Sequence, residues 1–331
     1  MRALVTGGTG FIGANLVAGL NQAGVAARVL CRPSSSHRAL EGLTYETVYG
    51  DILGPTVDLV EAMADCDWVF HAAAVADYWR QDADWIYKVN VEGTRRVVAA
   101  AQRAGVRRLV QVSSVTALGV PEPGRLLTES SRFNLSPNDN PYGHSKYLAE
   151  EVVKEGVAGG QDAVIVNLPI IIGPRDVNEI SGSMVTEAAR GTRLPIYPPG
   201  GTNYLHVTDA VLGILQVAHR AEVSERYLLA GQNLTYRAAF GIVCDVVGRP
   251  PPRFALPPWL VPLLAAAVGA ARVILNGRIP FDANQVRLSG RRLYVDGSKA
   301  RQELGLRPRP FRQAVQAAYD WYRENGYLDS S

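Results

Sequence analysis

Short apolar runs alternate with longer segments of helical periodicity along the first half of the chain. The compact apolar runs, which are typical of buried strands, occupy residues 2–5, 27–31, 45–49, 67–74 and 108–114. Apolar residues recur every three or four positions over 11–20 and 92–104, as they do along one face of a helix. Strands that alternate with helices predict a parallel sheet covered on both faces. We therefore expect an α/β, Rossmann-type doubly wound fold.

The pattern changes near residue 170. Residues 173–199 are rich in Gly, Pro and polar side chains, which predicts a loop that covers the substrate. Beyond it the periodicity predicts strands at 204–207 and 226–229 and helices at 209–219, 236–247 and 312–325. We expect a first, doubly wound domain over residues 1–170, to which 204–230 contribute. Residues 171–331 should form mainly a smaller, partly interleaved α/β domain that binds the substrate.

One segment, residues 256–275, is strongly apolar and carries few charges. Such a run invites comparison with a membrane span. Pro257, Pro258 and Pro262 interrupt it at its start and Arg272 near its end, so we expect no span. A helix that packs over the substrate pocket is the favoured interpretation. Peripheral association with a membrane surface stays open, because an apolar helix on a small domain can lie in an interface.

Composition narrows the class of protein. The 331 residues are 47% hydrophobic, which suffices for a buried core, and a net charge of +3 without a dense basic tract argues against a nucleic-acid partner. Cys31, Cys66 and Cys244 form neither an even set nor a CxxC pair, which favours reduced thiols and a cytoplasmic location. We see no signal peptide, since the first strand starts at residue 2. The expected partner is a small-molecule substrate, and a homodimer stays open.

The first strand runs directly into a glycine-rich turn, Thr6-Gly-Gly-Thr-Gly-Phe-Ile-Gly13. Gly7 permits a tight turn, Gly10 lets the backbone approach a pyrophosphate, and Gly13 lets the helix pack close to the strand. The N–H groups at the start of that helix attract phosphate. Because a strand precedes the turn and a helix follows it, we predict a dinucleotide site that includes Gly7, Thr9, Gly10, Phe11 and Ile12.

The ends of the next strands suit a nucleotide as well, because ligands bind at the carboxyl ends of parallel strands. His71 is followed by Ala72, Ala73 and Ala74, whose small side chains let a cofactor lie close, although packing alone also accounts for them. The third strand ends in Gly50-Asp51-Ile52. Two interpretations of Asp51 stay open: it binds the adenine amino group, or it caps the following turn.

The end of the second strand bears on the choice between NADP and NAD. In this type of fold an acid at that place binds the ribose hydroxyls of NAD, but here Cys31 holds the place and no carboxylate occurs between Gly13 and Glu41. Arg32 and the nearby Ser36 offer donors suited to a phosphate dianion. We therefore predict NADP, with NAD as the alternative, in which Arg32 is solvated or stacks on adenine.

A second constellation combines Ser113 and Ser114, at the end of the fifth strand, with Tyr142 and Lys146. Pro141 marks a helix start, so Tyr142 and Lys146 lie one turn apart on one helix face. A lysine ammonium near a phenol lowers the pKa of the phenol and allows it to exchange a proton with a substrate. Taken alone, Tyr and Lys at this spacing are also a common surface pair.

These segments together resemble a known family. The glycine turn, His71-Ala-Ala-Ala74, Asn90-Val-Glu-Gly-Thr94, Ser113-Ser114, Tyr142-x-x-x-Lys146 and Tyr204-Leu-His-Val-Thr-Asp209, in this order, resemble the extended short-chain dehydrogenase/reductase (NAD-dependent epimerase/dehydratase) family over nearly the whole chain. Four further segments are similar to its dihydroflavonol-4-reductase-like branch, which includes bacterial hopanoid-associated sugar epimerases: Leu30-Cys-Arg-Pro-Ser34, Asn167-Leu-Pro169, Gly173-Pro-Arg-Asp176 and Tyr322-Arg-Glu-Asn-Gly-Tyr327.

The resemblance implies roles for individual residues. Tyr142 matches the catalytic acid/base, Lys146 matches the residue that lowers its pKa and holds the nicotinamide ribose, and Ser114 matches the hydroxyl that orients the substrate oxygen. Asn90 resembles the helix residue that supports the active site. Pro169 and Ile170 resemble the strand end against which the nicotinamide rests. His206 and Asp209 resemble a structural motif that anchors the substrate region.

Four functions are considered for these residues. The favoured one is reduction of a carbonyl on an apolar or ring-bearing molecule, since Tyr78, Trp79, Trp85, Tyr197 and Trp259 could line one pocket. Sugar epimerisation with bound NAD(P) is the alternative. Dehydration is disfavoured by the resemblance, because dehydratases of the family tend to have Asp-Glu after the active-site hydroxyl and this sequence has Val115-Thr116 there. A non-catalytic NAD(P)-binding regulator would not need Ser114, Tyr142 and Lys146 together. The five histidines show no metal-ligand spacing, so we expect no metal.

Overall fold

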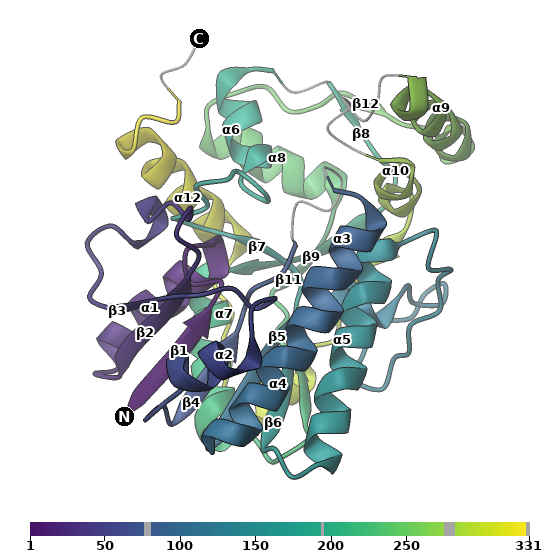
Figure 1. Cartoon of the computed structure of the whole chain (residues 1–331). Helices are drawn as coiled ribbons and strands as arrows, with labels where there is room; N and C mark the ends of the chain where they lie inside the picture. Colours follow the sequence, from purple (N-terminus) through teal and green to yellow (C-terminus); the bar gives the residue numbers. More distant parts are fainter. Residues whose placement is uncertain (76–80, 193–194, 275–281, 329–331) are drawn as a thin grey trace.

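A seven-stranded parallel sheet forms the centre of the molecule, in the order β10-β6-β5-β4-β1-β2-β3 (Figure 1). The computed structural model describes residues 1–75, 81–192, 195–274 and 282–328. The strands are β1 (Arg2–Thr6), β2 (Ala26–Cys31), β3 (Glu46–Tyr49), β4 (Trp68–His71), β5 (Arg108–Ser114), β6 (Ala163–Leu168) and β10 (Arg226–Leu228). The chain winds outward from β1 in both directions, so the predicted doubly wound fold is confirmed.

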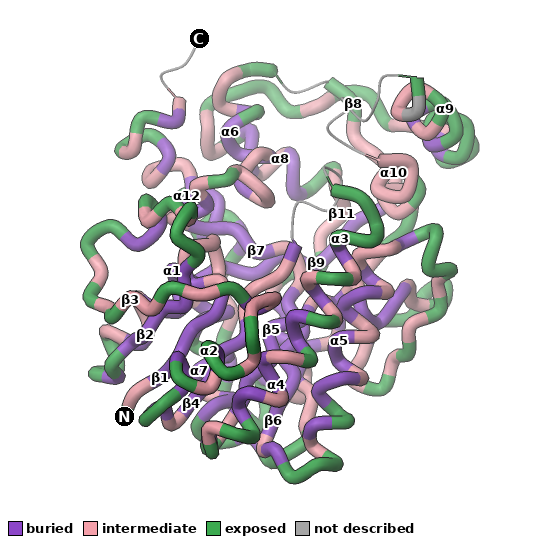
Figure 2. The backbone as a smooth tube through the Cα atoms, in the orientation of Figure 1, coloured by how far each residue is buried: buried purple, intermediate pink, exposed green. Residues whose placement is uncertain are grey.

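Helices cover both faces of this sheet because the strands are apolar on both sides. On β1, Ala3 and Val5 belong to one buried cluster and Leu4 to another, as the alternation of side chains along a strand requires. The inner strands β1, β4, β5 and β6 are mostly buried (Figure 2). The cluster with Ala3 and Val5 includes α1 (Phe11–Gln22) and α7 (Val207–Arg220). The cluster with Leu4 includes helices α2 (Thr56–Ala62), α4 (Gly93–Ala104) and α5 (Pro141–Ala158).

A second, smaller layer lies beyond the carboxyl edge of the sheet (Figure 1). Its four-stranded sheet comprises β7 (Ile170–Ile172), β9 (Gly201–His206), β11 (Gln232–Thr235) and β13 (Arg292–Leu293). Its core joins helices α6 (Ser183–Arg190), α8 (Tyr236–Val246) and α12 (Phe311–Glu324). The remaining elements of this part are β8 (Ile196–Tyr197), β12 (Phe254–Ala255), α9 (Leu260–Ile274) and α10 (Ala283–Ser289), whereas α11 (Ser298–Glu303) packs beside β10 of the large sheet. The closing helix predicted at 312–325 is α12.

The prediction of a continuous loop at 173–199 is wrong, because α6 and β8 lie inside it. Gly182 precedes α6 and Gly191, with φ of +74°, ends it, so its boundary residues gave the segment its loop-like composition. Met184, Val185 and Ala188 form the buried face of α6. Packing of that face against the smaller core stabilises a helix that the surrounding Gly and Pro residues obscure.

One strand prediction also needs correction. The fourth strand ends at His71 rather than at residue 74, because the Ala73 N–H turns to the side-chain hydroxyl of Thr6, at 3.3 Å. Within 204–230, β10 joins the large sheet but β9 belongs to the smaller one. The division into two domains at residue 170 therefore stays a prediction. In the part of the chain that the structure describes, no helix has both the length and the apolar character that crossing a bilayer requires.

A buried carboxylate ties α5 to three strands of the large sheet. Glu150 on α5 is fully buried and forms an ion pair with Arg226 on β10. Its Oε1 atom accepts hydrogen bonds from Ser113 on β5 and from the Asn167 side chain on β6, the latter at 2.6 Å. A buried charge is tolerated only when such partners satisfy it. This network therefore sets where α5, and every side chain that it carries, lies on the sheet.

We predict that Glu150→Gln lowers the free energy of unfolding by about 3 kcal/mol, because it leaves the Arg226 guanidinium without its buried counter-charge. Glu151→Gln is the matched control, since Glu151 pairs with Lys154 on the surface and such pairs contribute about 0–1 kcal/mol. Urea unfolding of the three proteins measures both values. Equal losses for the two variants would contradict the role of this network.

Candidate active site

The glycine turn after β1 forms a tight backbone cradle. Gly7 has φ of +69°, and a Cβ there would lie 2.6 Å from the Ala73 nitrogen. A Cβ on Gly13 would lie 2.2 Å from the Gly7 carbonyl oxygen, so both positions have room only for glycine. At Gly10 the nearest such atom is 3.3 Å away. Because Gly10 also precedes α1 and has no side chain to cap it, the first N–H groups of that helix suit a phosphate, and the cradle fits a dinucleotide.

The candidate residues from distant parts of the chain lie at one edge of the large sheet, where its parallel strands end. Each group follows its own strand: Gly7, Thr9, Gly10, Phe11 and Ile12 after β1; Arg32 and Ser36 after β2; Asp51 and Ile52 after β3; Ala72, Ala73 and Ala74 after β4; Ser114 at the end of β5; Pro169 and Ile170 after β6. Since the strand order switches from one side of β1 to the other between β3 and β4, the glycine turn and the three alanines flank the crevice where such sheets bind nucleotides.

In the segment after β2, some side chains bind other parts of the protein and others are exposed to solvent. Arg38 lies over the Tyr327 ring, 4.4 Å from its centroid, and donates to the Asn325 carbonyl. His37 is held by the Tyr45 hydroxyl at 2.8 Å. Arg32, Ser34 and Ser36 are exposed, so their side chains are donors of this segment that can reach a ligand at the strand end.

Asp51 caps the turn that follows β3, as one of its two interpretations predicted. Its Oδ1 atom accepts the Leu53 N–H at 2.8 Å, and the residue is exposed. The contact uses one carboxylate oxygen only. Whether Asp51 also binds the adenine amino group therefore stays a prediction. Ile52 is buried instead and packs against Gly93, where a Cβ would lie 2.6 Å from the Ile52 side chain.

Asn90 connects the end of β4 to the start of α5. It lies in a π-helical turn, η3 (Lys88–Glu92), which is an arrangement often found at functional sites. Its Oδ1 atom accepts the Val75 N–H and its Nδ2 atom donates to the Ser145 hydroxyl, both at 2.9 Å. Ser145 donates in turn to the Tyr142 carbonyl at 2.7 Å. Asn90 thus positions the backbone that carries Tyr142.

His71 is a buried residue whose role the sequence did not reveal. Its Nδ1 atom lies 2.7 Å from the Thr6 hydroxyl and its Nε2 atom lies 3.0 Å from the Thr94 hydroxyl. The Thr94 hydroxyl donates its proton to the Asn90 carbonyl at 2.6 Å, so it can only accept from His71 Nε2. In the neutral ring Nδ1 then carries no proton and accepts from the Thr6 hydroxyl. Burial, together with the charge of Lys146, lowers the pKa of His71 to about 3 and keeps the ring neutral.

Ser114, Tyr142 and Lys146 come together where β5 ends beside the start of α5. Asn140 caps α5 by accepting the Gly143 N–H at 2.9 Å, which fixes the first turn that carries Tyr142. Tyr142 is hydrogen-bonded to Ser114. Lys146 is buried and donates to the Val112 carbonyl of β5 at 2.9 Å. The three side chains that the sequence proposed therefore share one site.

Burial dominates the charge states of this site. It raises the pKa of Tyr142 to about 12, against the opposing effect of the Ser114 hydrogen bond. It lowers the pKa of Lys146 to about 8, against the opposing effect of Glu150. The pKa of Tyr142 thus lies above its usual value, because the loss of water around the phenol outweighs the Ser114 hydrogen bond, and the expectation that Lys146 lowers this pKa stays a prediction.

Ser114 has a further partner that the sequence did not single out. Thr116, in the 3-10 turn η4 (Val115–Leu118), donates from its hydroxyl to the Ser114 Oγ atom at 2.9 Å. The Ser114 carbonyl accepts from the Asn167 side chain at 2.9 Å. Both the backbone and the hydroxyl of Ser114 are thus held in place beside Tyr142.

The predicted anchoring motif on α7 makes structural contacts. His206 caps the helix by accepting the Thr208 N–H at 3.0 Å. Asp209 is buried, accepts the Arg309 N–H at 2.7 Å and forms an ion pair with the Arg309 guanidinium. These contacts tie the segment before α12 to a helix that packs on the large sheet.

The structure does not bring the candidate aromatic residues together. Tyr78 and Trp79 lie outside the described residues. Trp85 is on α3 (Ala83–Tyr87), Tyr197 packs against the smaller core, and Trp259 is 69% exposed. No ring contact joins these three among the residues that the structure describes. A shared aromatic lining is thus not seen in that part of the chain.

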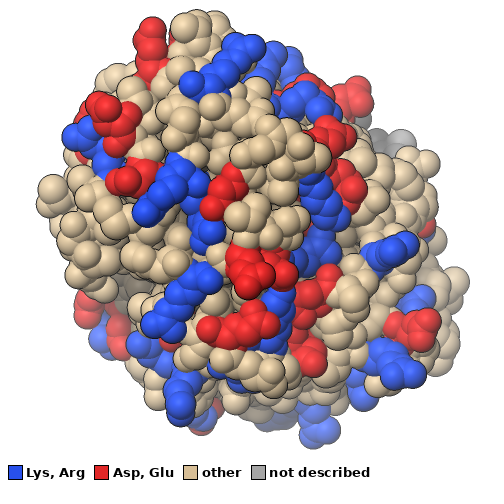
Figure 3. Space-filling model, turned by 90° about the horizontal axis from the view of Figure 1, so that it is seen from below, with Lys and Arg blue, Asp and Glu red and all other residues tan. Residues whose placement is uncertain are grey.

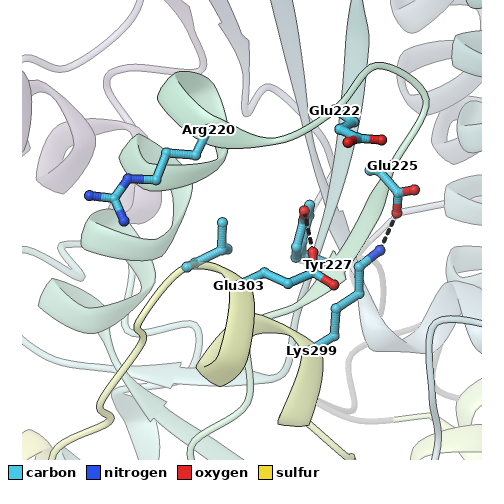
Figure 4. A pocket seen from close by; sticks show the side chains of 7 residues that line it. Arg220, Glu222, Glu225, Tyr227, Lys299 and Glu303 are labelled. Carbon is cyan, nitrogen blue, oxygen red and sulfur yellow. Dashed lines mark hydrogen bonds and ion pairs between the residues drawn. The ribbon is translucent and has the colours of Figure 1, made fainter.

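A separate cavity of about 360 Å³ lies at the opposite edge, where β10 begins (Figure 4). Its charged lining is largely engaged, because Lys299 forms an ion pair with Glu225 and the Tyr227 hydroxyl donates to Glu303 at 2.7 Å. Acidic and basic side chains are interspersed over the face seen from below (Figure 3). Since Ser114 and Tyr142 lie at the carboxyl edge, this cavity is not part of the candidate active site.

Comparisons with known proteins agree with this geometry. The model of the NAD dependent epimerase/dehydratase family matches residues 3–230. The Synechocystis sp. protein named "Putative dihydroflavonol 4-reductase" is 36% identical over 332 residues, which cover 98% of this chain and 95% of that protein. Sterol demethylase protein B of Methylococcus capsulatus is 34% identical over 336 residues, which cover 99% of this chain and all of that protein.

The crystal structure of gox2253 shares the fold with a TM-score of 0.86 and 32% identity, over 99% of both chains. Its full overlap with this chain includes the glycine turn and the elements that carry Ser114 and Tyr142. The chain therefore belongs to the NAD dependent epimerase/dehydratase family and is an NAD(P)-dependent enzyme of the extended short-chain dehydrogenase/reductase type.

Proposed function

We propose that this enzyme uses NADPH to reduce a carbonyl group on an apolar or ring-bearing small molecule. The observation that carries the proposal is the meeting of Ser114, Tyr142 and Lys146 at the edge of the sheet that also carries the glycine turn. In this proposal the part of the chain up to residue 170 holds the cofactor, and the smaller layer holds the substrate.

The bound nicotinamide would supply the hydride that reaches the carbonyl carbon. Tyr142 donates the proton that the carbonyl oxygen needs, since a phenol with a pKa of about 12 keeps its proton at neutral pH. Ser114 already hydrogen-bonds Tyr142 and orients the oxygen toward it. Lys146, when protonated, favours the phenolate that remains after proton transfer.

The surroundings of this site support an apolar substrate. A small hollow beside it has mainly apolar walls, formed by Val115, Thr116, Gly119, Leu127, Leu135, Asn140, Leu288 and Leu293. Val115 directly follows Ser114, and Asn140 lies two residues before Tyr142. The two relatives at 36% and 34% identity are named for a dihydroflavonol and a sterol, which are ring-bearing molecules.

Sugar epimerisation is the second candidate, because the chain also shares its family with epimerases. A screen of metabolites that follows NADPH absorbance separates the two. Net reduction consumes the reduced cofactor in proportion to product, whereas an epimerase regenerates it within each turnover. A purely regulatory NAD(P)-binding protein would change neither the cofactor nor the substrate.

We predict that Tyr142→Phe lowers turnover roughly 100- to 10,000-fold and leaves NADPH binding nearly unchanged, because only the transferable proton is lost. The measurement is the steady-state rate on a ketone that the parent enzyme reduces. Tyr147→Phe is the matched control, since Tyr147 stacks on Phe133 and should tolerate the loss of its hydroxyl. An unchanged rate in Tyr142→Phe would refute the assignment.

The pKa of Lys146 predicts the pH dependence of reduction. Its pKa of about 8 means that the ammonium charge is present below pH 8 and is lost above it. We expect the reduction rate to fall as pH rises through about 8, while Tyr142 stays protonated. Lys146→Arg keeps its charge over this range, so the fall near pH 8 should disappear even if the maximal rate is lower. A parent profile that stays flat up to pH 10 would contradict this role.

The exposed Arg32 predicts the cofactor preference. If its guanidinium binds the 2′-phosphate, Arg32→Ala should weaken NADPH binding about 10- to 100-fold and change NADH binding little, because hydrogen bonds between charged groups contribute about 1.5–3 kcal/mol. Arg38→Ala is the control, since Arg38 is occupied by Tyr327 and Asn325. Fluorescence titration measures the affinities of parent and variants for both cofactors. Equal affinities of the parent enzyme for NADH and NADPH would refute the preference.

A further inference from the structure

Helix α9 exposes an apolar face to solvent. Trp259, just before the helix, is 69% exposed, Leu263 is 59% exposed and Ile274 is 78% exposed. Pro262, Ala266, Ala267 and Ala270 are exposed as well, and at 100° per residue all seven positions fall on one side of the helix. A helix on the surface of a soluble domain normally turns polar side chains outward. Here the outward side is continuously apolar.

The opposite side of α9 is packed, so the exposed side cannot simply rotate inward. Val261, Ala265 and Val268 are buried at positions one helical turn apart. A Cβ on Gly290, next to α10, would lie 3.2 Å from Val261, and one on Gly269 would lie 3.6 Å from Ala283 at the start of α10. These contacts hold α9 against α10 at the margin of the smaller layer (Figures 1 and 2).

The charged residues that directly precede α9 and lie within it in the sequence are all basic. No Asp or Glu occurs between Asp245 and Asp282 in the sequence. Arg253 precedes α9 and is exposed, whereas the Arg249 guanidinium donates to the Ala189 carbonyl of α6. Arg291 and Arg292 are exposed too, and they directly follow the glycine that contacts Val261. An apolar face accompanied by arginines is complementary to an anionic lipid surface, where the headgroups carry negative charge above the acyl chains.

We propose that α9 docks the enzyme onto the surface of an anionic lipid bilayer, with Trp259, Leu263 and Ile274 at the boundary between headgroups and acyl chains. The helix has 15 residues and is therefore about 22 Å long, less than the roughly 30 Å of a bilayer core, so it lies in the interface and does not cross it. A second copy of the chain fits this face less well. A two-fold contact places the same patch against itself and would bring arginines against arginines.

Docking goes beyond the proposed function, because it requires no turnover, yet it would place the candidate site near the membrane. Helix α10 links the two: Arg287 forms an ion pair with Asp139, at 3.4 Å, three residues before Tyr142. Leu288 of α10 lines the small hollow beside Ser114 and Tyr142. An apolar substrate dissolved in the bilayer would then reach the site without crossing water.

The test is sedimentation of the full chain with vesicles of phosphatidylcholine containing one third phosphatidylglycerol, compared with vesicles of phosphatidylcholine alone. We expect binding to the anionic vesicles that is weakened by 0.5 M salt. Leu263→Gln combined with Ile274→Gln should reduce binding at least tenfold, because two exposed apolar side chains are lost. Val57→Gln is the matched control, as Val57 is a similarly exposed apolar residue on α2 and should bind like the parent.

A second measurement locates the docked face. Quenching of tryptophan fluorescence by brominated acyl chains should occur in the parent and largely disappear in Trp259→Phe. Unfolding temperatures near that of the parent establish that each variant is folded. No binding to anionic vesicles, or equal binding by the double variant, would overturn the proposal. So would sedimentation velocity that shows a dimer which the double variant dissociates, since the face would then be covered by a second copy. The steady-state reduction rate without vesicles tests the proposed function separately.

Discussion

A charged side chain without access to water has to be satisfied entirely by the protein, and Glu150 imposes this constraint on the centre of the molecule. Its partners come from three different strands, so β5, β6 and β10 can hold their places only if α5 holds its own. Lys146 lies one turn before Glu150 and Tyr142 one turn before Lys146. The carboxylate that stabilises the fold therefore also positions the residues proposed for proton transfer, and the two requirements cannot be changed independently.

The electrostatics of the site follow from the same enclosure. Burial disfavours charge on both Tyr142 and Lys146, so it moves their pKa values in opposite directions, to about 12 and about 8. The neutral phenol is suited to giving a proton to a carbonyl oxygen. The lysine remains charged at neutral pH because Glu150 partly offsets its desolvation. His71 stays neutral nearby and serves as a fixed hydrogen-bonding link between Thr6 and Thr94.

The two edges of the large sheet differ in character. At the amino edge, charges of both signs are interspersed and largely pair with one another (Figures 3 and 4). At the carboxyl edge, the glycine cradle, the catalytic candidates and an apolar hollow are followed outward by α10 and then by α9. Leu288 of α10 lines that hollow, and the exposed side of α9, which packs on α10, is apolar. A soluble domain would normally bury or avoid the outermost part of such a surface.

Much of the architecture was predictable because it depends on local pattern. The alternation of apolar runs and helical periods identified the parallel sheet, and the strand before Gly7 and the helix after it identified the cradle. The spacing of Tyr142 and Lys146 placed them on one helix face. The family resemblance, rather than any pattern, supplied the roles of Ser114 and Asn90. These features depend on residues that are neighbours in sequence or one helical turn apart.

Other features were decided only in three dimensions. The helix α6 forms within a Gly- and Pro-rich stretch because its buried face meets a core built by α8 and α12. Glu150 and His71 have partners on elements up to 76 residues away in sequence, so no local spacing of residues predicted these contacts. The sign of the Tyr142 pKa shift depended on how completely distant segments exclude water from the phenol. Sequence periodicity determines which face of an element is apolar, but desolvation and partners depend on everything that packs against that face.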